Sequence, residues 1–107
     1  MTDVRALEAR TGLLYVGGNF THAKNKPRNA LAAFNLLTGE LANFNPSPNF
    51  GVNAIEISYN TLYLGGYFSS VGNQPRNYIA AVNALSGTVR SWNPWVNGYI
   101  YDIEAQK

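Results

Sequence analysis

One sequence unit occurs twice in this chain, with its two copies 48 residues apart. Superposing residues 12–59 on residues 60–107 gives 19 identical pairs out of 48. The clearest match is Leu14–Phe20, which returns as Leu62–Phe68. Two such copies without a gap constrain the fold strongly, because a period of about 40–50 residues made of short strands is typical of stacked β repeats.

Each copy contains four short apolar runs bounded by Gly, Asn and Pro, a pattern that predicts strands rather than helices. Four antiparallel strands per unit is the make-up of a β-propeller blade. We therefore predict an all-β fold with two four-stranded antiparallel blades and an extra first strand. The predicted strands are 4–9 and 52–57, 14–20 and 62–68, 30–35 and 78–83, and 41–44 and 89–92.

The first strand recurs a third time near the C-terminus, since residues 3–10 match residues 51–58, which in turn match residues 99–106. Closed propellers have about four to eight blades, so two blades would leave apolar flanks open. We expect either a fragment of a longer propeller, which the surplus strand favours, or a closed ring of three or four copies. The predicted parts are blade 1 over 1–50, blade 2 over 51–97 and a further first strand over 98–107.

Paired glycines end the second strand of each unit, as Gly17-Gly18 and Gly65-Gly66. A phosphate-binding loop would need a helix after the glycines and a longer motif, and neither is present in this pattern. We interpret the glycines as structural positions where a neighbouring strand or blade approaches closely.

Charged residues also repeat once per unit. Glu8, Glu56 and Glu104 share one phase of the repeat, and Arg28 and Arg76 share another. We predict structural Arg–carboxylate pairs that tie the long connection over 21–29 to the first strand. The alternative is a ring of carboxylates that binds a cation.

Five motifs occur in the same order in both copies: Leu-Tyr-(Val/Leu)-Gly-Gly-x-Phe, Pro-Arg-Asn, Ala-Ala-(Phe/Val)-Asn, (Thr/Ser)-Gly and (Phe/Trp)-Asn-Pro. This series of motifs resembles the delta-60 type of β-propeller repeat. Such repeats occur in large exported bacterial proteins and in fungal cortical-marker proteins. The double glycine and the later Trp92 are also similar to kelch repeats, although Phe44 stands at the equivalent position of the first copy and the Pro-Arg-Asn connection departs from the kelch pattern. The resemblance implies a propeller in an extracytoplasmic, secreted or cell-surface setting, and it implies no catalytic residue.

Aromatic residues gather toward the C-terminus. Trp95, Tyr99 and Tyr101 are candidate binding residues, because exposed rings on a β scaffold stack on sugars or anchor a partner. Packing in the core or between blades is the structural alternative. Trp95 is the best binding candidate of the three, since Ser47 replaces it in the first copy.

Composition narrows the function classes. A net charge of +2 without a dense basic stripe argues against nucleic acid as a partner. No apolar stretch approaches the roughly 18 residues of a membrane helix. With no cysteine, His22 as the one histidine and no convincing catalytic pair of acids, we predict no metal, no cofactor and no enzymatic activity.

The sequence therefore predicts a non-catalytic propeller unit that acts as a structural or binding scaffold. Its expected partners are copies of itself or the rest of a longer chain, with a protein or glycan as a further ligand. The alternative function is a glycan-binding or glycan-active propeller module.

Overall fold

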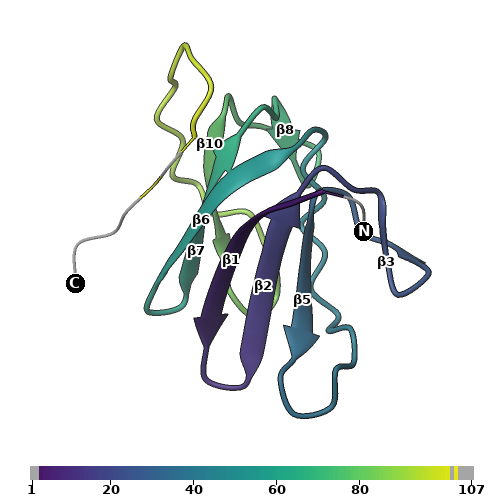
Figure 1. Ribbon diagram of the computed structural model, residues 1–107. Coiled ribbons are helices and arrows are strands. Elements are labelled where there is room, and N and C mark those ends of the chain that lie inside the picture. The colour runs from purple at the N-terminus through teal and green to yellow at the C-terminus, as the bar shows by residue number, and fades with distance from the viewer. Residues whose placement is uncertain (1–2, 102, 104–107) are drawn as a thin grey trace.

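The computed structural model of the protein describes residues 3–101 and residue 103, and all regular structure in this part of the chain is β. Two three-stranded antiparallel sheets, each accompanied by a two-stranded hairpin, make up the fold (Figure 1). The all-β prediction is confirmed. The first sheet has the order β1 (Val4–Arg10), β2 (Leu13–Gly18), β5 (Leu31–Asn35), with the hairpin β3 (His22–Ala23) and β4 (Lys26–Pro27). The second has the order β6 (Val52–Ser58), β7 (Thr61–Gly66), β10 (Ile79–Asn83), with the hairpin β8 (Ser70–Val71) and β9 (Gln74–Pro75).

The two sheets have the same strand register, displaced by 48 residues. Glu8 lies opposite Tyr15 in the first sheet, as Glu56 lies opposite Tyr63 in the second. The edge strands β1 and β6 each have a register shift at their start, between Val4 and Ala6 and between Val52 and Ala54. Equal sequence patterns have therefore produced equal local structures, including the bulge.

The prediction of a fourth strand in each sheet is wrong. The segments predicted as strands 41–44 and 89–92 make only single bridges, Phe34 to Leu41 and Val82 to Val89. Two constraints shorten this pairing. A proline follows soon after, at Pro46 and Pro94, and an arginine side chain donates to one carbonyl of each segment, that of Ala42 or Arg90.

The long connection over 21–29 is more ordered than the sequence indicated, because it folds back as the hairpin β3–β4. Its turn residues Lys24 and Asn25 both have positive φ, 47° and 65°. Gly72 and Asn73 repeat this geometry in the second unit, with φ of 56° and 65°. Positive φ at both central residues is the geometry of a two-residue hairpin, and Asn and Gly adopt it most easily.

The hydrophobic core lies between the sheets, where β6 contacts both β1 and β2 (Figure 1). We call this contact region the first seam. Successive side chains of a strand point to opposite faces, so each sheet contributes one alternating set to it. The buried side chains of the seam are Tyr15, Leu31, Ala33 and Phe44 from the first unit and Val52, Ile55, Leu62, Leu64, Phe68, Val71 and Val82 from the second. A smaller cluster of Val16, Phe20, Ala23 and Ala32 lies on the opposite face of the first sheet.

Candidate functional site

The first glycine of each pair lies at a contact between consecutive units. A Cβ on Gly17 would stand 2.8 Å from Cγ1 of Val52, and a Cβ on Gly65 would stand 2.3 Å from Cγ2 of Ile100. Val52 and Ile100 are themselves equivalent positions, 48 residues apart. The segment around Ile100 thus lies against the second sheet as β6 lies against the first. We call this second contact region the second seam.

The second glycine of each pair lies against the backbone of its own unit. A Cβ on Gly18 would lie 2.0 Å from the carbonyl oxygen of Asp3, and a Cβ on Gly66 would lie 2.2 Å from that of Gly51. These carbonyls accept hydrogen bonds from the amides of Asn19 and Tyr67, at 2.8 and 2.9 Å. The first glycine of each pair therefore permits close packing between units, and the second permits close packing of backbone at the bulge of β1 or β6.

The predicted Arg–carboxylate pairs are replaced by arginine–backbone contacts. Arg28 donates to the carbonyls of Pro27 and Ala42 at 2.8 and 3.0 Å, and Arg76 donates to those of Pro75 and Arg90 at 2.6 and 2.9 Å. Both arginines are nearly buried, and the two terminal nitrogens of each donate to carbonyls of the same unit. The buried Nε of each arginine has no hydrogen-bond partner among the described residues.

Of the three repeated glutamates, Glu8 and Glu56 lie in the part of the chain that the structure describes. One carboxylate oxygen of Glu8 accepts a hydrogen bond from the amide of Ile57 at 3.3 Å, which ties β1 to β6. Glu56 is half-buried and also has an interaction partner, and Glu104 lies outside the described residues. Within the described part of the chain, no three acidic or histidine side chains gather in an arrangement that could hold a metal ion.

The C-terminal aromatic residues separate into two groups. Tyr99 and Tyr101 pack edge-on against Tyr67, with ring centroids 4.7 and 6.1 Å apart, and Tyr99 also packs on Tyr78 at 5.0 Å. Trp95 is 67% exposed and takes no part in these ring contacts. The structure thus unites two of the three predicted binding residues in a tyrosine cluster, and none of these contacts supports the glycan alternative.

Arg5 lies beside this cluster and places a positive charge next to the Tyr67 hydroxyl. Its guanidinium donates to the hydroxyl of Tyr67 at 3.3 Å and forms a 3.1 Å salt bridge with Asp3. The hydrogen bond from Arg5 lowers the pKa of Tyr67, because the cation stabilises the phenolate. Burial acts in the opposite direction on Tyr101, whose pKa is raised.

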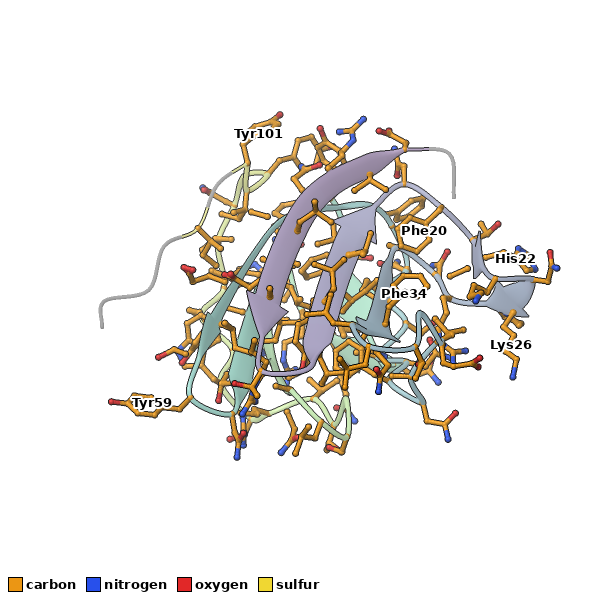
Figure 2. All side chains as sticks on the ribbon, turned by 60° about the horizontal axis from the view of Figure 1, so that its bottom comes forward. Phe20, His22, Lys26, Phe34, Tyr59 and Tyr101 are labelled. Atoms are coloured by element: carbon orange, nitrogen blue, oxygen red, sulfur yellow. The ribbon has the colours of Figure 1, made fainter. Side chains whose placement is uncertain are left out.

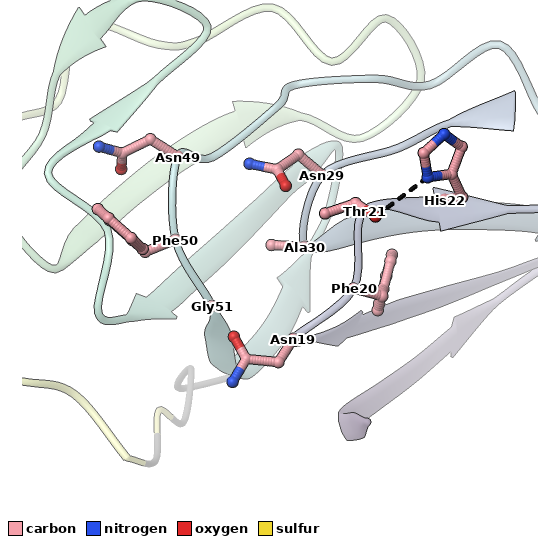
Figure 3. A pocket seen from close by; sticks show the side chains of 9 residues that line it. All are labelled: Asn19, Phe20, Thr21, His22, Asn29, Ala30, Asn49, Phe50 and Gly51. Atoms are coloured by element: carbon pink, nitrogen blue, oxygen red, sulfur yellow. Dashed lines mark hydrogen bonds between the residues drawn. The ribbon is translucent and has the colours of Figure 1, made fainter. Parts of the chain in front are cut away.

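An open groove of about 600 Å³ lies at the first seam (Figure 3). Three segments line it, one before β3, one before β5 and one before β6. Its residues are Asn19, Phe20, Thr21, His22, Asn29, Ala30, Asn49, Phe50 and Gly51.

Hydrogen bonds hold the walls of this groove in place. The Asn29 amide donates to the carbonyl of Pro48 at 2.5 Å, and the Asn49 side chain accepts from the amides of Ser69 and Ser70 at 2.8 and 3.1 Å. His22 of β3 is exposed at the end of the groove, with its Nδ1 3.0 Å from Oγ1 of Thr21. Figure 2 shows its ring pointing outward near Lys26.

Sequence reasoning missed this groove, although a signal was present. The two copies differ at Asn19 against Tyr67, Ala30 against Tyr78 and Gly51 against Tyr99. Each difference places a small or polar residue at the first seam where the second seam has a tyrosine. Only the fold shows that these three positions are neighbours.

Comparison with known proteins supports the fold and names no activity. Residues 60–89, which contain β7 to β10, match a family model described as a domain of unknown function (DUF5122) beta-propeller. No curated protein and no solved structure gave a match. Among the described residues, there is no helix with the length and apolar character needed to span a membrane. The all-β structure and the family match together identify the fold as one built on a β-propeller repeat.

Proposed function

We propose that this chain is a non-catalytic β-propeller unit that acts as a structural and binding scaffold, with each 48-residue copy forming one blade. The stacked sheets and the repeated glycine contacts support this reading, since both recur at the same spacing. The five ordered motifs further support a delta-60 type or kelch-like blade.

The observation that carries the proposal is the exposure of β1 compared with β6. Val52 and Ile55 of β6 are 0% and 7% exposed, because they pack across the first seam. Their equivalents on β1, Val4 and Leu7, are 46% and 62% exposed. The face of β6 that is buried at the first seam therefore has an exposed counterpart on β1, and a further blade would cover this exposed face.

The second sheet offers the complementary surface. The Ile100 side chain already packs against Gly65 there, and Ile100 is the third copy of the position occupied by Val4 and Val52. Val4 of a neighbouring blade unit would occupy this place if the C-terminal segment moved aside. Such head-to-tail contacts generate closed rings when the rotation per unit permits closure. The neighbouring unit is a second copy of this chain or part of a longer chain.

We also propose an extracytoplasmic or cell-surface setting. Its support is the resemblance of the motifs to repeats of exported propeller proteins.

Light scattering after size exclusion tests the scaffold proposal. We expect a sharp mass of three or four chains, which would give six or eight blades. Leu7→Asp should reduce this mass to that of one chain, because a buried carboxylate without a partner opposes association. Leu37→Asp is the matched control, since Leu37 is 93% exposed in the turn after β5 and should leave the mass unchanged.

If the chain is a monomer, a dye that binds exposed apolar surface distinguishes two further outcomes. A monomer that binds the dye, and loses this binding in Leu7→Asp, still supports an open blade face that a longer chain completes. A monomer that binds no dye contradicts the proposal, because its end faces would then need no further blade.

A further inference from the structure

The groove at the first seam lies where the second seam contains three tyrosine rings. Its residues Asn19, Ala30 and Gly51 correspond to Tyr67, Tyr78 and Tyr99 of the next copy. The backbone is equivalent as well, since Ala30 has a φ of 67° and Tyr78 a φ of 70°. The first seam thus keeps the framework of the second without its rings.

In the second seam, Tyr99 packs between the other two tyrosines. Its ring centroid lies 4.7 Å from that of Tyr67 and 5.0 Å from that of Tyr78, with interplanar angles of 87° and 82°. Edge-to-face packing of this kind is the favourable geometry for aromatic pairs. The fold therefore accommodates a tyrosine ring at this place between two blades.

The groove also offers an aromatic wall that the second seam lacks. Phe50 is 63% exposed there, whereas its equivalent is Gly98. Figure 3 shows Phe50 and Asn19 on the segments that border the groove. Ala30 and Gly51 are buried beneath the groove and the Asn19 side chain lies over Gly51, so the exposed Phe50 ring is the surface that an incoming ring would contact.

Polar groups at the groove suit a hydroxyl. Asn19 is exposed, and its side-chain amide lies over Gly51, makes no hydrogen bond to other described residues and offers both a donor and an acceptor. The exposed His22 ring adds a second such group at the groove's end. Asn29 and Asn49, by contrast, are already engaged in holding the walls.

We propose that this groove is a binding site for the side chain of a tyrosine in a partner peptide. The ring would pack against the exposed Phe50 ring beside Asn19, and its hydroxyl would hydrogen-bond to Asn19 or His22. This inference names a partner chemistry for the scaffold, and it does not depend on self-association, because the whole groove lies within one chain.

Titration with N-acetyl-L-tyrosinamide, followed by amide NMR shifts of the full chain, tests the site. We expect saturable shifts in the millimolar range, centred on the segments 19–22, 29–30 and 49–51, since one ring in an open groove binds weakly. Ala30→Tyr should weaken binding by about tenfold or more by filling the space as Tyr78 does. Leu37→Tyr adds the same side chain at an exposed turn and should bind as the unmodified chain does.

A second variant keeps the test decisive if Ala30→Tyr folds poorly. Phe50→Ala removes an exposed ring and should weaken binding by about fivefold while the spectrum stays native. N-acetyl-L-phenylalaninamide should bind more weakly than the tyrosine derivative, because it lacks the hydroxyl.

Three results would overturn the inference: no saturable shifts, shifts centred elsewhere, or equal binding by Phe50→Ala. Equal affinity for the phenylalanine derivative would overturn the assignment to tyrosine. The mass of each sample separates this question from the scaffold proposal, since loss of binding at unchanged mass concerns the groove alone.

Discussion

The residues Gly17 and Gly18 differ in what occupies the space where a side chain would stand. Gly17 faces Cγ1 of Val52, the end of a side chain, whereas Gly18 faces the backbone carbonyl of Asp3. A side chain can turn away by a few tenths of an ångström, but the carbonyl of Asp3, just before β1, cannot move without losing its hydrogen bond from the amide of Asn19. The two glycines should therefore differ in their tolerance of substitution.

We predict that Gly18→Ala lowers the free energy of unfolding by about 2–3 kcal/mol and that Gly17→Ala lowers it by about 1 kcal/mol. Gly98→Ala is the control, because nothing lies within 4 Å of its Cβ position, and its effect should stay within about 0.5 kcal/mol. Urea denaturation measures all three. A larger loss for Gly17→Ala than for Gly18→Ala would contradict the assignment of backbone contact to Gly18.

In each unit, an arginine side chain hydrogen-bonds to the segment that follows the last strand of the sheet. The segment after β5 pairs with it through the amide of Ala42, which donates to Ala33 at 2.8 Å, while the carbonyl of Ala42 accepts from Arg28. The second unit repeats this arrangement, with Arg90 donating its amide to Ala81 and accepting from Arg76. A planar guanidinium satisfies two carbonyls at once, which the single ammonium of lysine does less well.

Arg28→Lys should accordingly destabilise the chain by about 1–2 kcal/mol and speed hydrogen exchange at the amide of Ala42. Arg5→Lys is the comparison, since the Arg5 side chain is 36% exposed, and it should change stability by no more than about 0.5 kcal/mol. Unchanged exchange at Ala42 in Arg28→Lys would show that the arginine does not fasten this edge.

For the whole molecule, the decisive feature is that one set of equivalent residues has two environments. Val52 packs across the first seam at 0% exposure, whereas Val4, 48 residues earlier, is 46% exposed. A stacked array of repeats has this property at its end, because an end unit lacks one neighbour. The cost of a substitution should follow the neighbour, even where the residue and its strand position are the same.

Val52→Ala should therefore cost about 2 kcal/mol of unfolding free energy, and Val4→Ala less than about 0.5 kcal/mol. The measurement belongs at a protein concentration where light scattering shows a single chain, so that no second copy covers β1. Equal losses for the two variants in such monomers would mean that the first seam does not stabilise the fold.

Part of the candidate site was predictable from residues alone. Repetition of Gly17 and Gly65 indicated a position where packing permits no side chain, and Tyr99 and Tyr101 indicated an aromatic surface. The partners of Arg28 were not predictable, because a repeated charge fits a carboxylate or a carbonyl equally well in one dimension. The groove escaped prediction for a similar reason, since its three segments are neighbours only in the folded chain.

The repeat and the three main strands of each unit follow from the sequence, because hydrophobic patterns and turn residues act over a few positions. The tertiary structure was needed to show how far the fourth segment pairs, which carbonyls accept from Arg28 and Arg76, and that a groove opens at the first seam where the second seam contains tyrosines. The physical reason is that burial and hydrogen-bond partners depend on residues far apart in the chain, such as Gly51 beside Asn19. Identical positions in a repeat therefore acquire different environments only when the units stack.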